Sequence, residues 1–186
     1  MRQSEEDAPH GFAARRMEEL ARHHLLRRQR VASQVRGGRC NVEGRELLCF
    51  CSNDYLGMAA DERVAAAATA EILSSGAGSG SSRLLAGTRP SHASLEAEVA
   101  KALGEEAGLL FGSGYLANVG LIPALVGARD TILSDERNHA SIIDGCRLSR
   151  ARFLAYPHCD PDGLRRLLAG AGPGRKLVLT ESVLFW

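Results

Sequence analysis

Segments typical of buried strands alternate with segments typical of helices along the second half of the chain. Helical patterns begin near residues 91, 115, 139 and 160, and each is followed by a short apolar run, at 107–111, 130–134, 151–156 and 176–180. Strands that alternate with helices usually pair in parallel, and a parallel sheet needs helices on both faces. The order therefore predicts an α/β fold with helices around a mostly parallel sheet.

The first third of the chain is organised differently. Helix-forming residues with apolar positions at helical spacing predict an amphipathic helix over 12–30, with arginines between the apolar positions. Glycines and short apolar runs at 37–50 indicate strands and turns, and an alanine-rich stretch at 61–73 predicts a second helix. We expect an N-terminal helix and strand segment over 1–58 and the first part of a larger domain over 59–186.

Composition excludes several classes of protein. The 186 residues include 23 Lys plus Arg and 22 Asp plus Glu, so the net charge of +1 gives no reason to expect a nucleic-acid partner. No apolar stretch reaches the ~20 residues of a membrane span, and the polar start is unlike a signal peptide, so we expect a cytoplasmic protein with no membrane partner. The five cysteines form no Cys-x-x-Cys pair and indicate reduced thiols, and we expect no metal site.

A glycine- and serine-rich stretch at 76–90 separates the two parts. Glycine weakens helices and strands and serine competes for backbone partners, so the stretch is not a core element. A flexible linker is one interpretation. Arg83, Leu84 and Leu85 interrupt the polar run, however, and an ordered loop that approaches a ligand closely uses the same glycines.

The sequence FGSGY at 111–115 places a glycine turn between an expected strand end and a helix start. Free backbone N–H groups and the positive end of the helix dipole make such a turn an anion site, for which phosphate is the natural ligand. A tight turn without a ligand remains an alternative. A dinucleotide site is another, because GSGYLA fits G-x-G-x-x-G/A and Asp135 follows as an acidic ribose ligand would, but such fingerprints usually open the first βαβ unit.

His139 follows the expected strand at 130–134. The carboxyl ends of parallel strands face the ligand crevice, so a loop after one strand can face the turn at 112–114 after its neighbour. His139 is therefore a candidate to lie over whatever that turn holds. A lone histidine at a helix start is also often a cap or a surface group, unless a cofactor is argued independently.

Five motifs together resemble the α-oxoamine synthase family of pyridoxal-phosphate (PLP) enzymes, and most closely its 8-amino-7-oxononanoate synthase subgroup. They occur in the family's order and spacing, and the resemblance extends from about residue 16 to 183. The motifs are SNDYLG at 52–57, GAGSGSSRLLAGTRPSHASLE at 76–96, FGSGYLAN at 111–118, ERNHASIIDG at 136–145 and VLTESV at 178–183.

Membership implies PLP-dependent transferase fold type I, a homodimer, and decarboxylative condensation of an amino acid with an acyl-CoA. For the closest subgroup the substrates are L-alanine and pimeloyl-CoA, in biotin biosynthesis. The alternative is another α-oxoamine synthase, of the glycine C-acetyltransferase or serine palmitoyltransferase type. A non-catalytic remnant that keeps the phosphate turn is a further alternative.

The resemblance also assigns roles to single residues. Gly114 and Tyr115 match the backbone pair at the cofactor phosphate, and His139 matches the imidazole that stacks on the pyridine ring and helps to hold substrate. Arg27, which alone would belong to a solvated basic face, matches a substrate-contacting arginine. Ser141 and Glu181 match positions near the cofactor.

The catalytic lysine of the family has no match in this chain. The resemblance places that Schiff-base lysine, with an aspartate and a histidine, further along than Trp186, and neither Lys101 nor Lys176 matches it. We therefore expect the amino-terminal half of the enzyme, inactive alone and without a catalytic residue of its own. Cys49 and Phe185 depart from the family pattern, which has asparagine and serine there.

Overall fold

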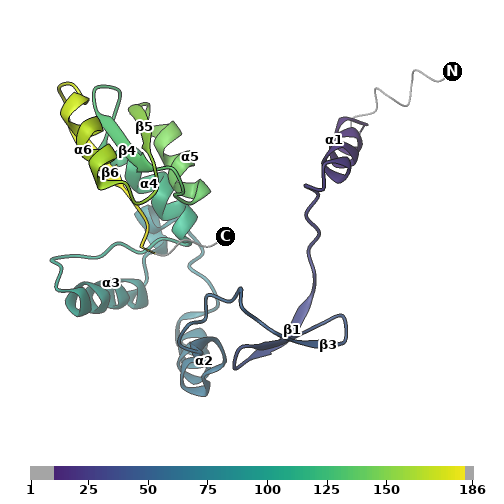
Figure 1. The fold of residues 1–186 in the computed structure, drawn as a ribbon. Helices are drawn as coiled ribbons and strands as arrows, with labels where there is room; N and C mark the ends of the chain where they lie inside the picture. Colours follow the sequence, from purple (N-terminus) through teal and green to yellow (C-terminus); the bar gives the residue numbers. More distant parts are fainter. Residues whose placement is uncertain (1–10, 183–186) are drawn as a thin grey trace. The chain divides into compact units, whose positions relative to one another are not determined.

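The computed structural model describes residues 11–182, with the side chains of 34–36 excepted. The chain divides into two compact units, Met1–Gly80 and Ser81–Trp186. This division falls inside the glycine- and serine-rich stretch, whereas the boundary expected after residue 58 lies within the first unit. Figure 1 shows the order of the elements along the chain. In the described part, no helix is long and apolar enough to cross a membrane.

From residue 11 onward, the first unit contains two α-helices, a short 3-10 helix (Met58–Ala60) and a small antiparallel sheet. Strand β2 (Arg39–Val42) lies between β1 (Ala32–Arg36) and β3 (Arg45–Leu48). Helix α2 (Glu62–Ser75) begins at Asp61, whose carboxylate accepts a hydrogen bond from the backbone N–H of Arg63 at 2.8 Å. The alanine-rich helix expected at 61–73 is therefore confirmed, with an N-cap that satisfies one of its first N–H groups.

The first helix is shorter than the sequence predicts. Helix α1 (Gly11–Arg22) ends well before residue 30. His24 adopts a left-handed conformation with φ of 56°, and the N–H of Leu25 bonds back to the carbonyl of Leu20 at 2.8 Å. This geometry closes the last turn in the manner of a helix C-terminus, so the basic residues that follow lie outside the helix, in a segment without regular secondary structure. The expectation of a helix through Arg30 was wrong.

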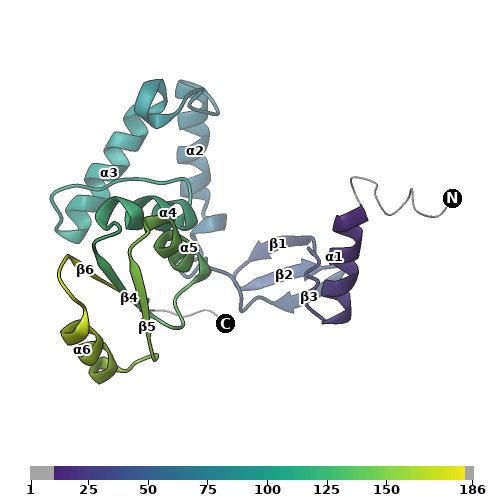
Figure 2. The same ribbon diagram turned by 90° about the horizontal axis from the view of Figure 1, so that it is seen from above.

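The second unit is built around a three-stranded parallel sheet. Strand β4 (Thr131–Asp135) lies in the middle, between β5 (Arg152–Tyr156) and β6 (Lys176–Leu179). Helices α4 (Gly114–Leu125) and α5 (Ala140–Ser149) lie together on one face, and α6 (Pro161–Gly170) lies on the other, as Figures 1 and 2 show. The predicted parallel sheet with helices on both faces is confirmed.

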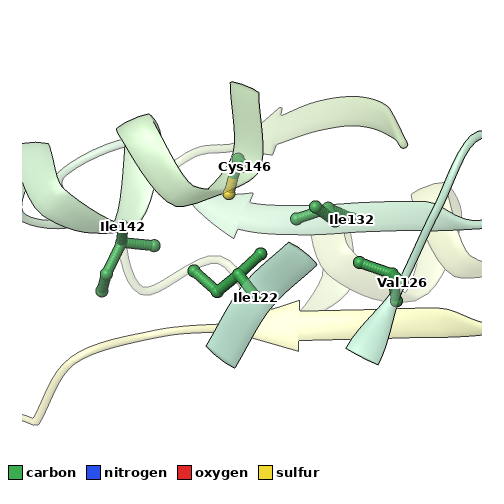
Figure 3. Packing of buried hydrophobic residues seen from close by; sticks show 5 residues of the cluster. All are labelled: Ile122, Val126, Ile132, Ile142 and Cys146. Atoms are coloured by element: carbon green, nitrogen blue, oxygen red, sulfur yellow. The ribbon is translucent and has the colours of Figure 1, made fainter. Parts of the chain in front are cut away.

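The core lies between the central strand and the α4–α5 pair. Ile132 and Leu133 of β4 have no solvent exposure. Ile132 belongs to a cluster that joins the three elements (Figure 3), and Ala151, Leu177 and Leu179 pack against it. The cluster consists of Ile122, Val126, Ile132, Ile142 and Cys146. Burial of these side chains stabilises the sheet edge at which the polar residues of the candidate site begin.

The apolar run at 107–111 is not a strand, contrary to the sequence-based expectation. The N–H of Leu110 donates to a carboxylate oxygen of Glu96 at 2.7 Å, and its carbonyl accepts from the guanidinium of Arg83 at 2.8 Å. Side chains therefore form hydrogen bonds with the backbone N–H and C=O groups that would otherwise pair with a neighbouring strand. Glu96 belongs to α3 (Pro90–Leu103), the helix predicted from residue 91 and ended by Gly104 as expected.

The same contacts decide between the two interpretations of the glycine- and serine-rich stretch. Arg83 also bonds Glu96 directly at 2.6 Å, and residues Arg83–Gly87 form a π-helical turn. Gly87 is buried, and a Cβ at that position would lie 2.0 Å from the carbonyl oxygen of Ser81. From Ser81 onward the stretch is thus an ordered loop and not a flexible linker.

Candidate functional site

The glycine turn at 112–114 leads directly into α4. The side-chain oxygen of Ser113 caps the helix by accepting from the N–H of Leu116 at 3.1 Å. Within residues 11–182, the N–H groups of Gly114 and Tyr115 have no hydrogen-bond partner. A Cβ at Gly114 would meet nothing within 4 Å. The helix start therefore offers donors, open space and the positive end of a helix dipole, which together suit an anionic oxygen.

The second part of the site is the loop between β4 and α5. His139 is the N-cap of α5, because its Nδ1 accepts from the backbone N–H of Ser141 at 3.1 Å. The hydroxyl of Ser141 lies 2.7 Å from the same Nδ1 and accepts from the side-chain amide of Asn118 at 2.8 Å. An Nδ1 that accepts from an N–H carries no proton, so the Ser141 hydroxyl also donates to it. The neutral ring therefore carries its proton on Nε2.

Helices α4 and α5 hold these two parts together. Asn118 lies one helical turn after Gly114 and reaches Ser141 near the start of α5. Tyr115 donates from its hydroxyl to the carboxylate of Asp144 at 3.1 Å, and this hydrogen bond to the negative Asp144 raises the pKa of Tyr115. The glycine turn and His139 are thus joined by two side-chain bridges between the helices.

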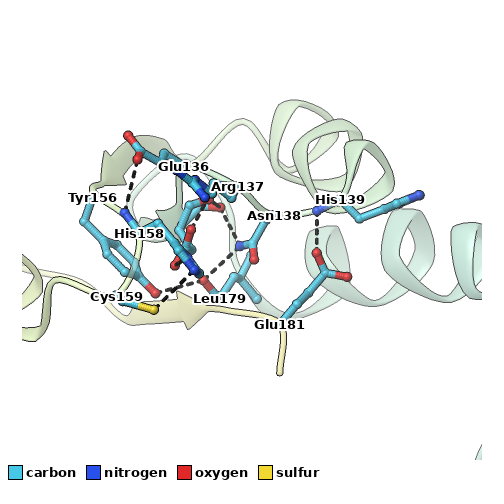
Figure 4. Close-up of polar contacts among 11 residues, drawn as sticks. Glu136, Arg137, Asn138, His139, Tyr156, His158, Cys159, Leu179 and Glu181 are labelled. Atoms are coloured by element: carbon cyan, nitrogen blue, oxygen red, sulfur yellow. Dashed lines mark hydrogen bonds and ion pairs between the residues drawn. The ribbon is translucent and has the colours of Figure 1, made fainter. Parts of the chain in front are cut away.

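Glu181 and Asn138 complete the network at the carboxyl edge of the sheet. Glu181, just after β6, accepts a short hydrogen bond from the backbone N–H of His139 (Figure 4). The side-chain amide of Asn138 donates to Ser134 at 2.8 Å and to the carbonyl of Leu179 at 2.9 Å. These bonds fix the loop that carries His139 across the ends of β4 and β6.

The remaining sequence candidates lie elsewhere. Arg27 belongs to the first unit, in the segment after α1, so its contact with substrate stays a prediction. Lys176 begins β6 and so lies at the amino end of that strand, opposite the edge occupied by Glu181. Lys101 is on α3. Cys49 lies in the first unit, and Phe185 is outside the described residues.

The acidic residue required by the dinucleotide interpretation, Asp135, is not accessible to a ligand. Asp135 is 3% exposed, and its carboxylate already accepts from the N–H of Arg137 and from Nδ1 of His158, both at 2.9 Å. A ribose ligand requires a carboxylate that is accessible in the crevice. The site therefore favours a phosphate monoester at the turn over a dinucleotide.

Three positioning residues were missed by sequence reasoning. Asn118 and Asp144 contact site residues across two helices, and Asn138 holds the loop before His139 to the ends of β4 and β6. A signal existed for Asn118, which is the last residue of FGSGYLAN and lies four residues after Gly114 on the same helix face. No local pattern connects Asp144 with Tyr115, because these partners are 29 residues apart.

The chain belongs to the aminotransferase class I and II family, whose sequence pattern it matches over residues 45–184. Among curated relatives, it is 49% identical over 168 residues to the 8-amino-7-oxononanoate synthase of Geobacter sulfurreducens. It is 49% identical over 176 residues to the protein of the same name from Anaeromyxobacter sp. strain Fw109-5. These matches cover 90% and 95% of this chain but 43% and 44% of the relatives, so the chain spans less than half of their length.

Solved structures of serine palmitoyltransferase resemble this fold. The protein from Sphingomonas wittichii matches with a TM-score of 0.78 and 30% identity, over 96% of this chain and 44% of that one. A variant from S. paucimobilis with a bound PLP–myriocin aldimine matches with a TM-score of 0.79 and 28% identity, over the same shares of the two chains. The predicted membership and the predicted fold class, part of the large domain of a fold-type-I PLP transferase, are confirmed.

Proposed function

We propose that this chain supplies the PLP-phosphate turn and the ring-stacking histidine of an 8-amino-7-oxononanoate synthase. The reaction is the decarboxylative condensation of L-alanine with pimeloyl-CoA in biotin biosynthesis. The observation that carries the proposal is the pair of side-chain hydrogen bonds that leads from Asn118, one helical turn after Gly114, through Ser141 to His139. The identity to two curated synthases supports the choice of subgroup.

The residues present fit PLP. The unpartnered N–H groups of Gly114 and Tyr115 suit the cofactor phosphate, and the open space at Gly114 lets that phosphate approach the backbone. His139 is exposed at the start of α5, where its imidazole face is available to a planar ring. When bound, PLP supplies an electron sink for the bond to the α-carbon of the amino acid.

The neighbouring side chains set what His139 can do. With Nδ1 engaged by Ser141, the Nε2–H is the only ring donor left, and it suits a carboxylate or carbonyl oxygen of the substrate. Glu181 holds the backbone of His139, so a substrate meets an imidazole whose position is already fixed. Preorganised donors lower the cost of orienting the reacting groups.

The proposal also covers the role of Arg27, the oligomeric state and the location. We propose a homodimer in the cytoplasm. Arg27 contacts the substrate, and two copies of the full-length protein form active sites between them. The guanidinium suits a carboxylate, which pimeloyl-CoA carries at the end of its acyl chain. The partners are thus an amino acid, an acyl-CoA and a second copy, with neither nucleic acid nor membrane involved.

The test is to join this chain to the carboxyl-terminal part of the Geobacter sulfurreducens relative and to measure CoA release. We expect PLP-dependent release with L-alanine and pimeloyl-CoA. His139→Ala should lose activity by about 100-fold or more, because the change acts at the reacting centre, whereas His23→Ala should retain it. Equal activity of His139→Ala and the parent would refute the placement of the cofactor ring.

The second candidate is serine palmitoyltransferase chemistry. The observation that favours it is the TM-score of 0.78–0.79 to solved serine palmitoyltransferases over 96% of this chain. The same joined protein distinguishes the two, because L-serine would then exceed L-alanine as substrate, whereas a preference for glycine would indicate the glycine C-acetyltransferase type. A joined protein that folds and binds PLP but condenses none of the three amino acids would indicate a non-catalytic remnant.

A further inference from the structure

A second polar cluster lies beside the site but takes no part in it. The sulfur of Cys159 is 3.2 Å from Nε2 of His158 (Figure 4). Nδ1 of the same ring is 2.9 Å from the carboxylate of Asp135. The three groups therefore stand in the order thiol, imidazole, carboxylate. That order is the arrangement of a nucleophile, a base and a residue that orients the base.

The surroundings decide where the protons lie. Burial raises the pKa of Asp135, but hydrogen bonds from the N–H of Arg137 and from His158 outweigh that effect and leave it below its ordinary value. Asp135 is therefore an anion that accepts from Nδ1–H of His158. The lone pair of Nε2 then faces the Cys159 thiol and can take its proton. The backbone N–H of His158 also bonds Glu136 at 3.2 Å, which helps to fix the ring.

Cys159 adopts an unfavourable backbone conformation at this position. Its φ of 57° lies in the left-handed region, which a residue with a Cβ rarely adopts. Cys159 stands between β5 and the N-cap of α6, where the N–H of Asp160 bonds the carbonyl of Pro157 at 3.1 Å. The thiol is exposed, so a reagent in solvent can reach it. Strained conformations of this kind occur often at functional positions.

We propose that Cys159 is a nucleophilic thiol and a site of redox modification by disulfides. His158 removes the thiol proton, the Cys159 sulfur attacks one sulfur of a disulfide R–S–S–R, and a new S–S bond forms while the old one breaks. The departing thiolate takes the proton from His158 and leaves as R–SH. One equivalent of disulfide is consumed, one thiol is released, and Cys159 ends as a mixed disulfide.

The test is a competition among the cysteines of one sample. The chain is treated with a small amount of 4,4′-dithiodipyridine, and the labelled peptides are quantified by mass spectrometry. Cys51 is the internal control, because it is also exposed but has no histidine partner among the described residues. We expect Cys159 to react about tenfold faster than Cys51 at neutral pH. When guanidinium unfolds the chain, the ratio of the two labelling rates should fall to about one.

Two variants separate base assistance from simple exposure. His158→Gln keeps a polar side chain but removes the base, so it should bring the rate of Cys159 down to that of Cys51. The matched control His23→Gln, in the first unit, should leave the ratio unchanged. The proposal is overturned if Cys159 reacts no faster than Cys51, or if its advantage survives His158→Gln.

Discussion

The orientation of the His139 ring depends on neighbours more than on His139 itself. Ser141 supplies two donors to Nδ1, and Asn118 fixes the direction of the serine hydroxyl by donating to its oxygen. A change at Asn118 therefore acts on the imidazole through one intermediate hydroxyl, without touching the ring.

Neutral His139 should carry its proton on Nε2 and not on Nδ1 in both the parent and Asn118→Asp, because the backbone N–H of Ser141 points at Nδ1 in both. In Asn118→Asp the Ser141 hydroxyl donates to the new carboxylate, so the backbone N–H of Ser141 is the donor that remains at Nδ1. Long-range ¹H–¹⁵N correlation spectra distinguish the two tautomers. As a control, Asn118→Ala should retain Nε2–H, because the Ser141 N–H still points at Nδ1, and should cost about 1 kcal/mol of stability. An Nδ1–H ring in the unaltered chain would contradict this account.

At the scale of the elements, helices α4 and α5 pack closely against each other. A Cβ at Gly145 of α5 would lie 2.7 Å from the carbonyl oxygen of Asn118 and 2.9 Å from Cδ1 of Ile122, both on α4. Gly145→Ala should therefore separate the helices and lower the free energy of unfolding by about 1–3 kcal/mol. Urea unfolding followed by circular dichroism measures the change. Gly127→Ala is the control, because a Cβ there meets nothing within 4 Å; equal stability of the two variants would contradict the packing.

The loops that precede β4 and β6 depend on Asp130. Its carboxylate accepts from the N–H of Gly127 at 3.0 Å and from the N–H and guanidinium of Arg175 at 2.9 Å, and these bonds lower the pKa of Asp130 to about 2. The folded-state pKa of Asp130 lies below the ordinary 3.8. Its carboxylate therefore contributes fully to the free energy of unfolding above about pH 4, and this contribution is lost as the pH falls toward 2.

Asp130→Asn should therefore lower the melting temperature at pH 7. Between pH 4 and 2, the melting temperature of this variant should then fall less than that of the parent. Glu96 contributes to the residual fall, because the hydrogen bonds from Arg83 and from the N–H of Leu110 lower its pKa to about 2 as well, and Asp135, whose pKa is also lowered, adds to it. Thermal melts across this range measure both effects. Asp162→Asn, at an exposed pair with Arg165, should match the parent. A parallel acid response of Asp130→Asn and the parent would show that Asp130 is not the cause.

The sequence predicted those elements whose signal is local. Apolar alternation and capping residues were sufficient for the parallel strands and for α5, which His139 opens. The run at 107–111 has the same local pattern but bonds Glu96 and Arg83, and no local rule reports such a contact. At the site, the glycine turn and His139 carry recognisable chemistry. The Asn118–Ser141 bridge depends on how two helices pack, so it required the structure.

At the scale of the whole molecule, the open edge of the parallel sheet has consequences for solution behaviour. Strand β6 pairs with β4 on one side, and within residues 11–182 no strand pairs with its other side. Apolar side chains on α3, α4 and β6 are also two-fifths or more exposed, including Leu103, Leu116 and Leu121. Unpaired strand edges beside apolar surface favour association between copies.

The 186-residue chain alone should therefore associate as its concentration rises, and Val178→Lys should reduce that association. Val178 is 40% exposed on β6, while its neighbours Leu177 and Leu179 pack against the core, so a lysine at 178 places charge on the edge strand without entering the core. Size-exclusion chromatography with light scattering measures the mass. Val178→Thr, which keeps the β-branched shape without charge, should associate like the parent. A monodisperse monomer with a cooperative melt at every concentration would show that the exposed edge does not drive association.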